Sequence, residues 1–295
     1  MTQLVELQKK LPQLNAAGIK VFGISYDSVD ILKDFSDDYS IGYDLLSDPD
    51  SAVIKQVGIL NTLIEEDSDA ELVGDKSMYG LPFPGVYVLD EEGRVIEKFF
   101  NRSFATRSSA GNILNAALGE ILRPEEVPAV DFISDQIEFS AFLADEDLKL
   151  EYLSTLYVRF QVAEGLHIYA DPLPRGFIAT TVSVAETPGL TIGEPIYPPT
   201  QLMAFEALDV ELPVYGGVVD VEIPITANAA TINGSLGGPI ESLDVAIDVH
   251  YQVCSDSFCY LPKTEHLTMT IPIAARIMPR PEVLNSFREL MQRRQ

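Results

Sequence analysis

The sequence between positions 249 and 262 is Val249-His250-Tyr251-Gln252-Val253-Cys254-Ser255-Asp256-Ser257-Phe258-Cys259-Tyr260-Leu261-Pro262, and it holds the only two cysteines of the chain. Apolar residues alternate with other residues on both sides, at Leu243, Val245, Ile247 and Val249 before the cysteines and at Leu267, Met269 and Ile271 after them. Such alternation is typical of β-strands with one buried face. The stretch therefore predicts a β-hairpin that carries both cysteines at or near its tip, where two sulfurs can meet.

The same period of two runs through the second half of the chain. Short alternating segments occur at 158–162, 181–184, 218–225 and 243–251, and proline and glycine separate them. Short strands at regular spacing with turn residues between them are typical of a β-sandwich. The second half is therefore predicted to be all-β.

The first half has a different pattern, in which helix and strand signals alternate. Helices are predicted at 4–17, 30–39, 51–57 and 113–122, strands at 19–25 and 43–47, and a β-hairpin with a Glu-Gly turn at 84–96. Strands separated by helices predict an α/β sheet with helices on its faces.

A proline-rich joint at 123–128 separates the two patterns, and 295 residues suffice for two domains. We predict an α/β domain at 1–126, a β-sandwich at 129–276 and a short basic helix at 280–295, which has Pro281 near its start.

Composition narrows the classes of partner. The chain carries 45 acidic and 20 basic residues, a formal net charge of −25, which disfavours binding to nucleic acid or to anionic membrane surfaces. No apolar run is long enough for a transmembrane helix. The N-terminus lacks the basic start and apolar core of a secretory signal, so we expect a chain that is cytoplasmic, processed or cut at its front.

The first half resembles a known family through residues 15–28, residues 45–50, and Pro84 followed by the strand 86–90. These segments are similar to the alkyl hydroperoxide reductase/thiol-specific antioxidant group of peroxiredoxins, which has the thioredoxin fold. The resemblance implies that Pro84 is the cis-proline before a central strand; a simple turn proline is the alternative. In that family the reactive cysteine lies at the N-terminal end of the first long helix, where the helix dipole favours the thiolate.

That cysteine position has no counterpart here, because the first helix begins at or just after Met1 and no cysteine precedes Cys254. The strand that should precede the helix is missing as well. The resemblance therefore implies a thioredoxin-like domain that is incomplete at its N-terminus. Either the start of the gene has been placed too late, or the domain is a catalytically inactive remnant. In both cases no peroxidase activity is predicted from this chain.

The cysteine stretch resembles the N-terminal domain of the thiol:disulfide interchange protein DsbD, an immunoglobulin-like sandwich whose redox cysteines stand in a Tyr-Gln-x-Cys … Phe-Cys-Tyr-x-Pro context. Four residues separate Cys254 from Cys259, one fewer than the form we associate with the family. Residues 165–169 resemble the strand that places aromatic residues near the cysteines, and residues 214–216 resemble the loop that caps them. The resemblance implies Cys254 and Cys259 as the redox pair, with the site lined by His167, Tyr169, Val214, Tyr215, His250, Tyr251, Phe258 and Tyr260.

The resemblance implies thiol–disulfide exchange with a thioredoxin-fold partner, without a cofactor, in the periplasm or cell envelope; the N-terminal sequence leaves the cytoplasm open. Cys259 is the sulfur expected to meet the partner. Asp256 and its acidic neighbours are expected to raise the thiol pKa values and so to slow the reaction at neutral pH.

A structural disulfide in a non-catalytic binding or scaffold protein is the alternative. Closing a loop of about six residues contributes only about 2 kcal/mol in the loop-entropy model, and an exposed pair at a tip is better placed for exchange than for stabilisation. A metal site is the least favoured reading, because the cysteines and the scattered His167, His250 and His266 lack ligand spacing.

Overall fold

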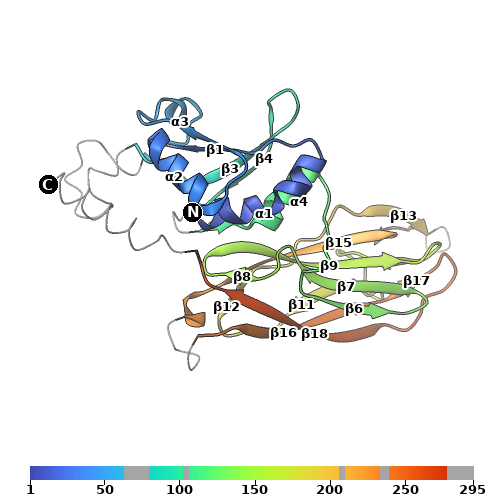
Figure 1. Cartoon of the computed structure of the whole chain (residues 1–295). Coiled ribbons are helices and arrows are strands. Elements are labelled where there is room, and N and C mark those ends of the chain that lie inside the picture. The colour runs from blue at the N-terminus through green and yellow to red at the C-terminus, as the bar shows by residue number, and fades with distance from the viewer. Residues whose placement is uncertain (63–79, 102–105, 206–209, 233–238, 278–295) are drawn as a thin grey trace. The chain divides into compact units, whose positions relative to one another are not determined.

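The computed structural model describes residues 1–62, 80–101, 106–205, 210–232 and 239–277 (Figure 1). They form two compact units, one of residues 1–120 with 276–277 and one of residues 121–275. The helix predicted at 280–295 lies outside the described residues. No helix within the described ranges is long and apolar enough to cross a membrane.

The first unit alternates helices and short strands, as the sequence pattern predicts. Its elements are α1 (Thr2–Ala16), β1 (Phe22–Ser25), α2 (Val29–Tyr39), β2 (Asp44–Ser47), α3 (Ala52–Gln56), β3 (Gly85–Leu89), β4 (Val95–Phe100), β5 (Arg107–Ser108) and α4 (Ala110–Leu118).

Local capping fixes the two ends of α4. The Ser109 side chain accepts the backbone N–H of Asn112, which satisfies a donor that the first turn leaves free. The helix stops at Leu118 because Gly119 takes a left-handed conformation with φ 68°. The prediction of a helix at 113–122 was therefore placed too far along the chain by three to four residues.

The strands of this unit form two separate pairs. β1 runs parallel to β2, and β3 runs antiparallel to β4. The two pairs share one hydrophobic core with α1 and α4, built from Leu7, Leu11, Ile41, Tyr43, Ala110 and Ile113 with Leu45, Val86 and Phe99 against it. The prediction of a single sheet was wrong for the described residues, because no described strand lies hydrogen-bonded between the two pairs.

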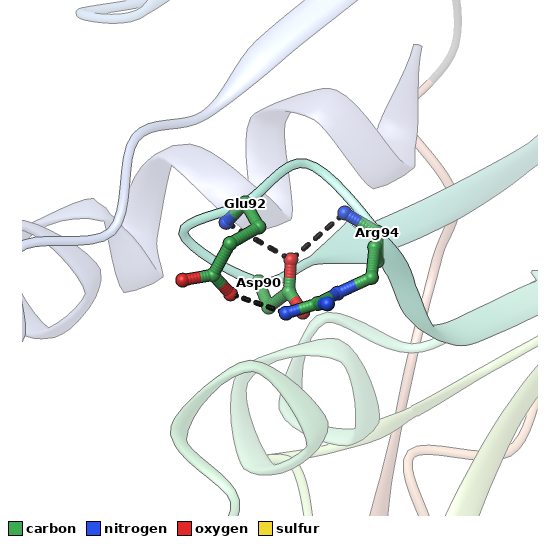
Figure 2. A network of polar contacts seen from close by, with 3 residues as sticks. All are labelled: Asp90, Glu92 and Arg94. Atoms are coloured by element: carbon green, nitrogen blue, oxygen red, sulfur yellow. Dashed lines mark hydrogen bonds and ion pairs between the residues drawn. The ribbon is translucent and has the colours of Figure 1, made fainter.

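The turn between β3 and β4 is held by one carboxylate (Figure 2). Asp90 accepts the backbone N–H groups of Glu92 at 3.1 Å and Arg94 at 2.8 Å, and its other oxygen accepts Arg94 Nε at 2.9 Å. These hydrogen bonds, above all that from the Arg94 side chain, lower the pKa of Asp90. Gly93 has φ 78°, which the turn requires. The predicted hairpin with a Glu-Gly turn is confirmed.

Pro84 precedes β3 through a trans peptide bond, so the prediction of a cis-proline there was wrong. The cis bond found in the described chain joins Asp171 to Pro172. Pro82 lies in an antiparallel bridge with Leu60, and Phe83 N donates to Ile59 O at 2.6 Å. The chain is therefore already extended as it reaches Pro84, and a trans bond, which X–Pro peptides favour, continues it into β3.

The described residues of the second unit form strands and a short 3₁₀ turn at Ala229–Thr231. Its strands are β6 (Ala129–Ile133), β7 (Ile137–Leu143), β8 (Leu148–Lys149), β9 (Tyr152–Val162), β10 (His167–Tyr169), β11 (Thr181–Val184), β12 (Leu190–Ile192), β13 (Gln201–Phe205), β14 (Val210–Tyr215), β15 (Val218–Ala227), β16 (Ser242–Tyr251), β17 (Val253–Cys254) and β18 (Lys263–Ala274).

Two sheets of this unit share one core. The first has the order β12-β15-β9-β7-β6 and the second the order β11-β16-β18-β8. Alternate residues of each strand enter the core, such as Val221 and Ile223 of β15 and Val245 and Ile247 of β16, all at most 1% exposed. The alternation seen in the sequence is therefore confirmed as burial of one strand face. A third sheet, of order β13-β14-β10-β17, carries Cys254.

Candidate functional site

Cys254 and Cys259 form a disulfide with an S–S distance of 2.05 Å and a Cα–Cα distance of 4.0 Å. A tight turn brings them together. Ser255 N donates to Phe258 O at 2.8 Å, and Tyr260 N donates to Val253 O at 2.9 Å. The Ser255 hydroxyl accepts the backbone N–H groups of Ser257 and Phe258. The turn thus places the cysteines opposite each other in an antiparallel bridge.

The turn that carries the cysteines is not paired within the hairpin whose two strands flank it. β16 and β18 pair as far as Tyr251 and Lys263. Beyond Tyr251, the short strand β17 pairs with β10 of the third sheet, so that Val253 lies opposite Ile168 and Cys254 opposite His167. The flanking strands do form the predicted hairpin, but Cys254 belongs to another sheet, and Cys259 is bridged to it. The sequence does not show this pairing because β10 lies more than 80 positions earlier in the chain.

The two sulfurs have different environments. Cys254 is fully buried in a cluster with Tyr169, Leu212 and Val214, whereas Cys259 is exposed. The expectation of an exposed pair was therefore wrong for Cys254, since the pairing of β17 with β10 draws it inside. Only Cys259 is open to an approaching protein.

Aromatic rings surround the buried side of the pair. The His167 ring packs edge-on against Tyr169, with centroids 5.2 Å apart, and against Phe205 at 5.6 Å. Tyr169 also contacts Phe177 at 5.3 Å. Phe177 and Phe205 were not predicted as site residues. The alternation of Met203 and Phe205 with Val210, Leu212 and Val214 on two paired strands is the signal that indicates this second, smaller core.

The residues predicted to form a cap loop belong to a strand. Val214 and Tyr215 end β14, where they pair with Tyr169 and Ile168. Val214 enters the cluster around Cys254, and the ring of Tyr215 joins the main core while its hydroxyl donates to Pro198 O at 3.3 Å. The loop prediction at 214–216 was wrong for these two residues, because the partners in β10 extend the strand to Tyr215.

The other predicted residues divide between the two sides of the site. Phe258 and Tyr260 flank Cys259, contact each other edge-on at 5.1 Å, and are 53% and 38% exposed. Tyr251 packs in the main core against Phe139, and burial raises its pKa to about 12. His250 shares a hydrogen bond of 2.8 Å between its Nδ1 and Thr264 Oγ1 on β18.

A shallow pocket adjoins the exposed side of the turn. Gln136, Tyr251, Val253, Tyr260, Leu261 and Lys263 line it. Leu261 is 83% exposed, so together with Phe258 and Tyr260 it presents an apolar surface beside Cys259. An exposed disulfide sulfur beside apolar side chains is suited to contact with another protein.

Comparison with known proteins gives two separate matches along the chain. Residues 1–98 match the AhpC/TSA family, and residues 139–271 match the N-terminal region of the thiol:disulfide interchange protein DsbD. The first part of the chain is thus similar to the AhpC/TSA family, and a later part is similar to the DsbD N-terminal region. Both resemblances found in the sequence are confirmed, and together they support a thiol–disulfide redox role.

Individual relatives cover parts of the chain. Peroxiredoxin Bcp of Escherichia coli K12 is 29% identical over 117 residues, which are 38% of this chain and 65% of that protein. A peroxiredoxin-like bcp protein of Coxiella burnetii is 34% identical over 85 residues, which are 28% of this chain and 48% of that protein. The chain therefore spans between 48% and 65% of the length of these relatives.

Two solved structures are similar to the chain at low identity. The Neisseria meningitidis DsbD N-terminal domain in the reduced form aligns with 52% of this chain and 91% of its own, at 17% identity and a TM-score of 0.28. The N-terminal periplasmic domain of ScsB from Proteus mirabilis aligns with 48% of this chain and 49% of its own, at 11% identity and a TM-score of 0.32.

Proposed function

We propose that this chain exchanges electrons with a thioredoxin-fold protein through Cys254 and Cys259, and that the unit carrying them is an immunoglobulin-like sandwich. The observation that carries the proposal is the asymmetry of the pair, in which Cys259 is exposed beside apolar side chains and Cys254 is buried. A disulfide that only stabilises a fold has no need of an open sulfur, whereas exchange requires one.

The reaction follows from this asymmetry. In the reducing direction, a thiolate of the partner attacks Cys259 Sγ, and a partner–Cys259 bond forms as the Cys254–Cys259 bond breaks. The electron pair of the broken bond passes to Cys254 Sγ. The second thiol of the partner then attacks the partner's own sulfur in the mixed disulfide and releases Cys259 as a thiolate. The partner loses two electrons and two protons, and this chain gains them.

The match to the DsbD N-terminal region supports a proposal for the partner and for the compartment. We propose a thioredoxin-fold redox protein as the partner and the periplasm or cell envelope as the place of reaction. The reaction uses no cofactor. We propose that residues 1–120 supply no peroxidatic sulfur, because both cysteines of the given sequence lie in the other unit.

Single-cysteine variants test the proposal. Both variants are first converted to the mixed disulfide with thionitrobenzoate, so that the remaining cysteine carries a leaving group. The Cys254→Ser chain keeps the exposed cysteine and should form a mixed disulfide with reduced thioredoxin whose resolving cysteine is replaced, with release of thionitrobenzoate. The Cys259→Ser chain keeps only the buried sulfur and should form at least tenfold less. Ser242→Ala, at the far end of β16, should exchange like the unaltered chain. The adduct is measured by non-reducing electrophoresis and mass spectrometry.

A redox titration distinguishes thiol–disulfide exchange from the alternative of a scaffold protein with a structural disulfide. A pair that equilibrates with glutathione buffers supports exchange. A pair whose potential lies below about −300 mV and that remains inert to glutathione indicates a structural disulfide, and would overturn the proposal. Equal adduct yields from the two single-cysteine variants would overturn the assignment of Cys259 as the sulfur that meets the partner.

A further inference from the structure

One buried histidine lies directly across from the buried sulfur. His167 of β10 is opposite Cys254 of β17 in an antiparallel register. Side chains at opposite positions of an antiparallel pair project from the same face, with Cβ atoms about 5 Å apart. His167 is 2% exposed, and no described residue makes a hydrogen bond to its Nε2. The ring therefore lies beside Cys254 with one nitrogen unused.

The surroundings of this nitrogen are mainly aromatic. Tyr169 and Phe205 contact the His167 ring edge-on. The titratable groups that face it among the described residues are Tyr169 on its own strand, Cys254 across from it, and Asp256 in the cysteine turn. Burial lowers the pKa of His167, while the charge of Asp256 acts in the opposite direction. In the disulfide form the ring is therefore neutral at pH 7.

A buried polar atom without a partner is unfavourable, so its retention calls for an explanation. The disulfide form does not provide such an explanation, because a disulfide sulfur carries no proton that Nε2 could accept. Reduction changes this, since Cys254 Sγ becomes a thiolate or a thiol in the same place. A buried thiolate is unfavourable unless a positive charge or a proton donor lies next to it.

We propose that His167 Nε2 is the proton partner of Cys254 Sγ in the reduced chain. This inference rests on the proposed exchange function and adds to it the group that makes the buried sulfur reactive. In the oxidised form Nε2 holds a lone pair and the ring proton is on Nδ1. When the disulfide opens, one of the two protons that the partner dithiol gives up is shared between Cys254 Sγ and His167 Nε2. In the reverse direction, Nε2 takes the proton of Cys254 so that its thiolate can resolve the mixed disulfide at Cys259.

The pairing also compensates for the acidic surroundings. The charge of Asp256 disfavours a thiolate nearby, and burial disfavours it further. An imidazolium across the strand pair counters both effects at once. His250 and His266 have other partners, Thr264 and Asp248, and provide natural comparisons within the same chain.

The test uses the full chain, which has three histidines, so three imidazole Cε1–H signals are expected in a proton NMR titration. The signals are assigned with His250→Phe and His266→Phe. Chemical reduction should move the His167 titration midpoint up by at least one pH unit and leave the other two unchanged. The Cys254→Ser variant also lacks the disulfide but has no sulfur at position 254, and there the rise should be absent. An equal rise in Cys254→Ser would show that loss of the disulfide alone moves His167, and would overturn the inference.

Thiolate absorbance gives a second measurement. In the reduced chain, His167→Phe keeps an aromatic ring and should raise the pH at which the first thiolate forms by at least one unit, a tenfold loss of thiolate at a given pH. His266→Phe, at an exposed position, should leave the curve unchanged. An unchanged curve in His167→Phe refutes the inference even if exchange with thioredoxin is normal. Since both titrations use chemically reduced protein, their outcome is separate from the outcome of the exchange assay.

Discussion

Reduction of the disulfide should destabilise the second unit only slightly. Cys254 and Cys259 are five positions apart, so the bond closes a loop of about six residues, for which the chain-entropy relation gives about 2 kcal/mol at 25 °C. The main core of this unit takes most of its residues from the strands of the two other sheets and does not include either cysteine. The unit should therefore stay folded when the bond is opened.

Hydrogen–deuterium exchange read by mass spectrometry measures this change in each unit separately. The slowest amides of β9 and β15 should exchange about 30-fold faster in the reduced chain, the factor that corresponds to about 2 kcal/mol. Amides of α1 and α4 belong to the unit without cysteines and serve as the internal control. An acceleration of several thousandfold in β9 and β15, about 5 kcal/mol, would refute the reasoning and would favour a disulfide that holds the fold together.

Three further predictions concern the framework of the two units. Asp220→Ala removes the carboxylate that accepts Arg159 Nε at 2.6 Å across β9 and β15; because the pair is partly buried, the second unit should lose about 1–3 kcal/mol by the same exchange measurement, and an unchanged rate would contradict a stabilising role. Gly119→Ala should destabilise the end of α4 by about 1 kcal/mol, since φ 68° disfavours a side chain; Ala116→Gly in the same helix is the comparison, and a more stable Gly119→Ala chain would show the reasoning to be wrong. The Arg123 guanidinium lowers the pKa of Asp131 below its usual value near 4. This ion pair therefore contributes stability above about pH 4 and loses that contribution as the pH falls through the lowered pKa. Asp131→Asn should weaken the pH dependence of stability in urea unfolding, and a profile identical to that of the unaltered chain would contradict this prediction.

The local pattern of the sequence was enough to predict most helices and strands and the strands that flank the cysteines. Alternation along β15 and β16 predicted which residues enter the core, and the Gly93 turn predicted the β3–β4 hairpin. These features depend on neighbours in the chain, so the residues themselves specify them. The ends of α4 were misjudged because the cap at Ser109 and the left-handed Gly119 are details of backbone conformation.

The site was only partly predictable. Cys254 with His167 and Tyr169 came together as the resemblance implied, and Phe258 and Tyr260 flank Cys259. Phe205 and Phe177 were missed, and Val214 was assigned to a loop, because the third sheet assembles from segments that are far apart in sequence. The cis assignment at Pro84 failed for the opposite reason: a motif implied it, but the extended chain around Pro82 continues through a trans bond.

By itself, the sequence determined that this chain has an α/β part and a β part, and that Cys254 and Cys259 are its only cysteines. Those conclusions rest on periodicity and on residue types, which need no partner elsewhere in the chain. The tertiary structure alone decided that the two sulfurs differ. The pairing of β17 with β10 buries Cys254 opposite His167 and leaves Cys259 at the surface. The burial of Cys254 depends on this long-range pairing, which no local pattern of residues specifies.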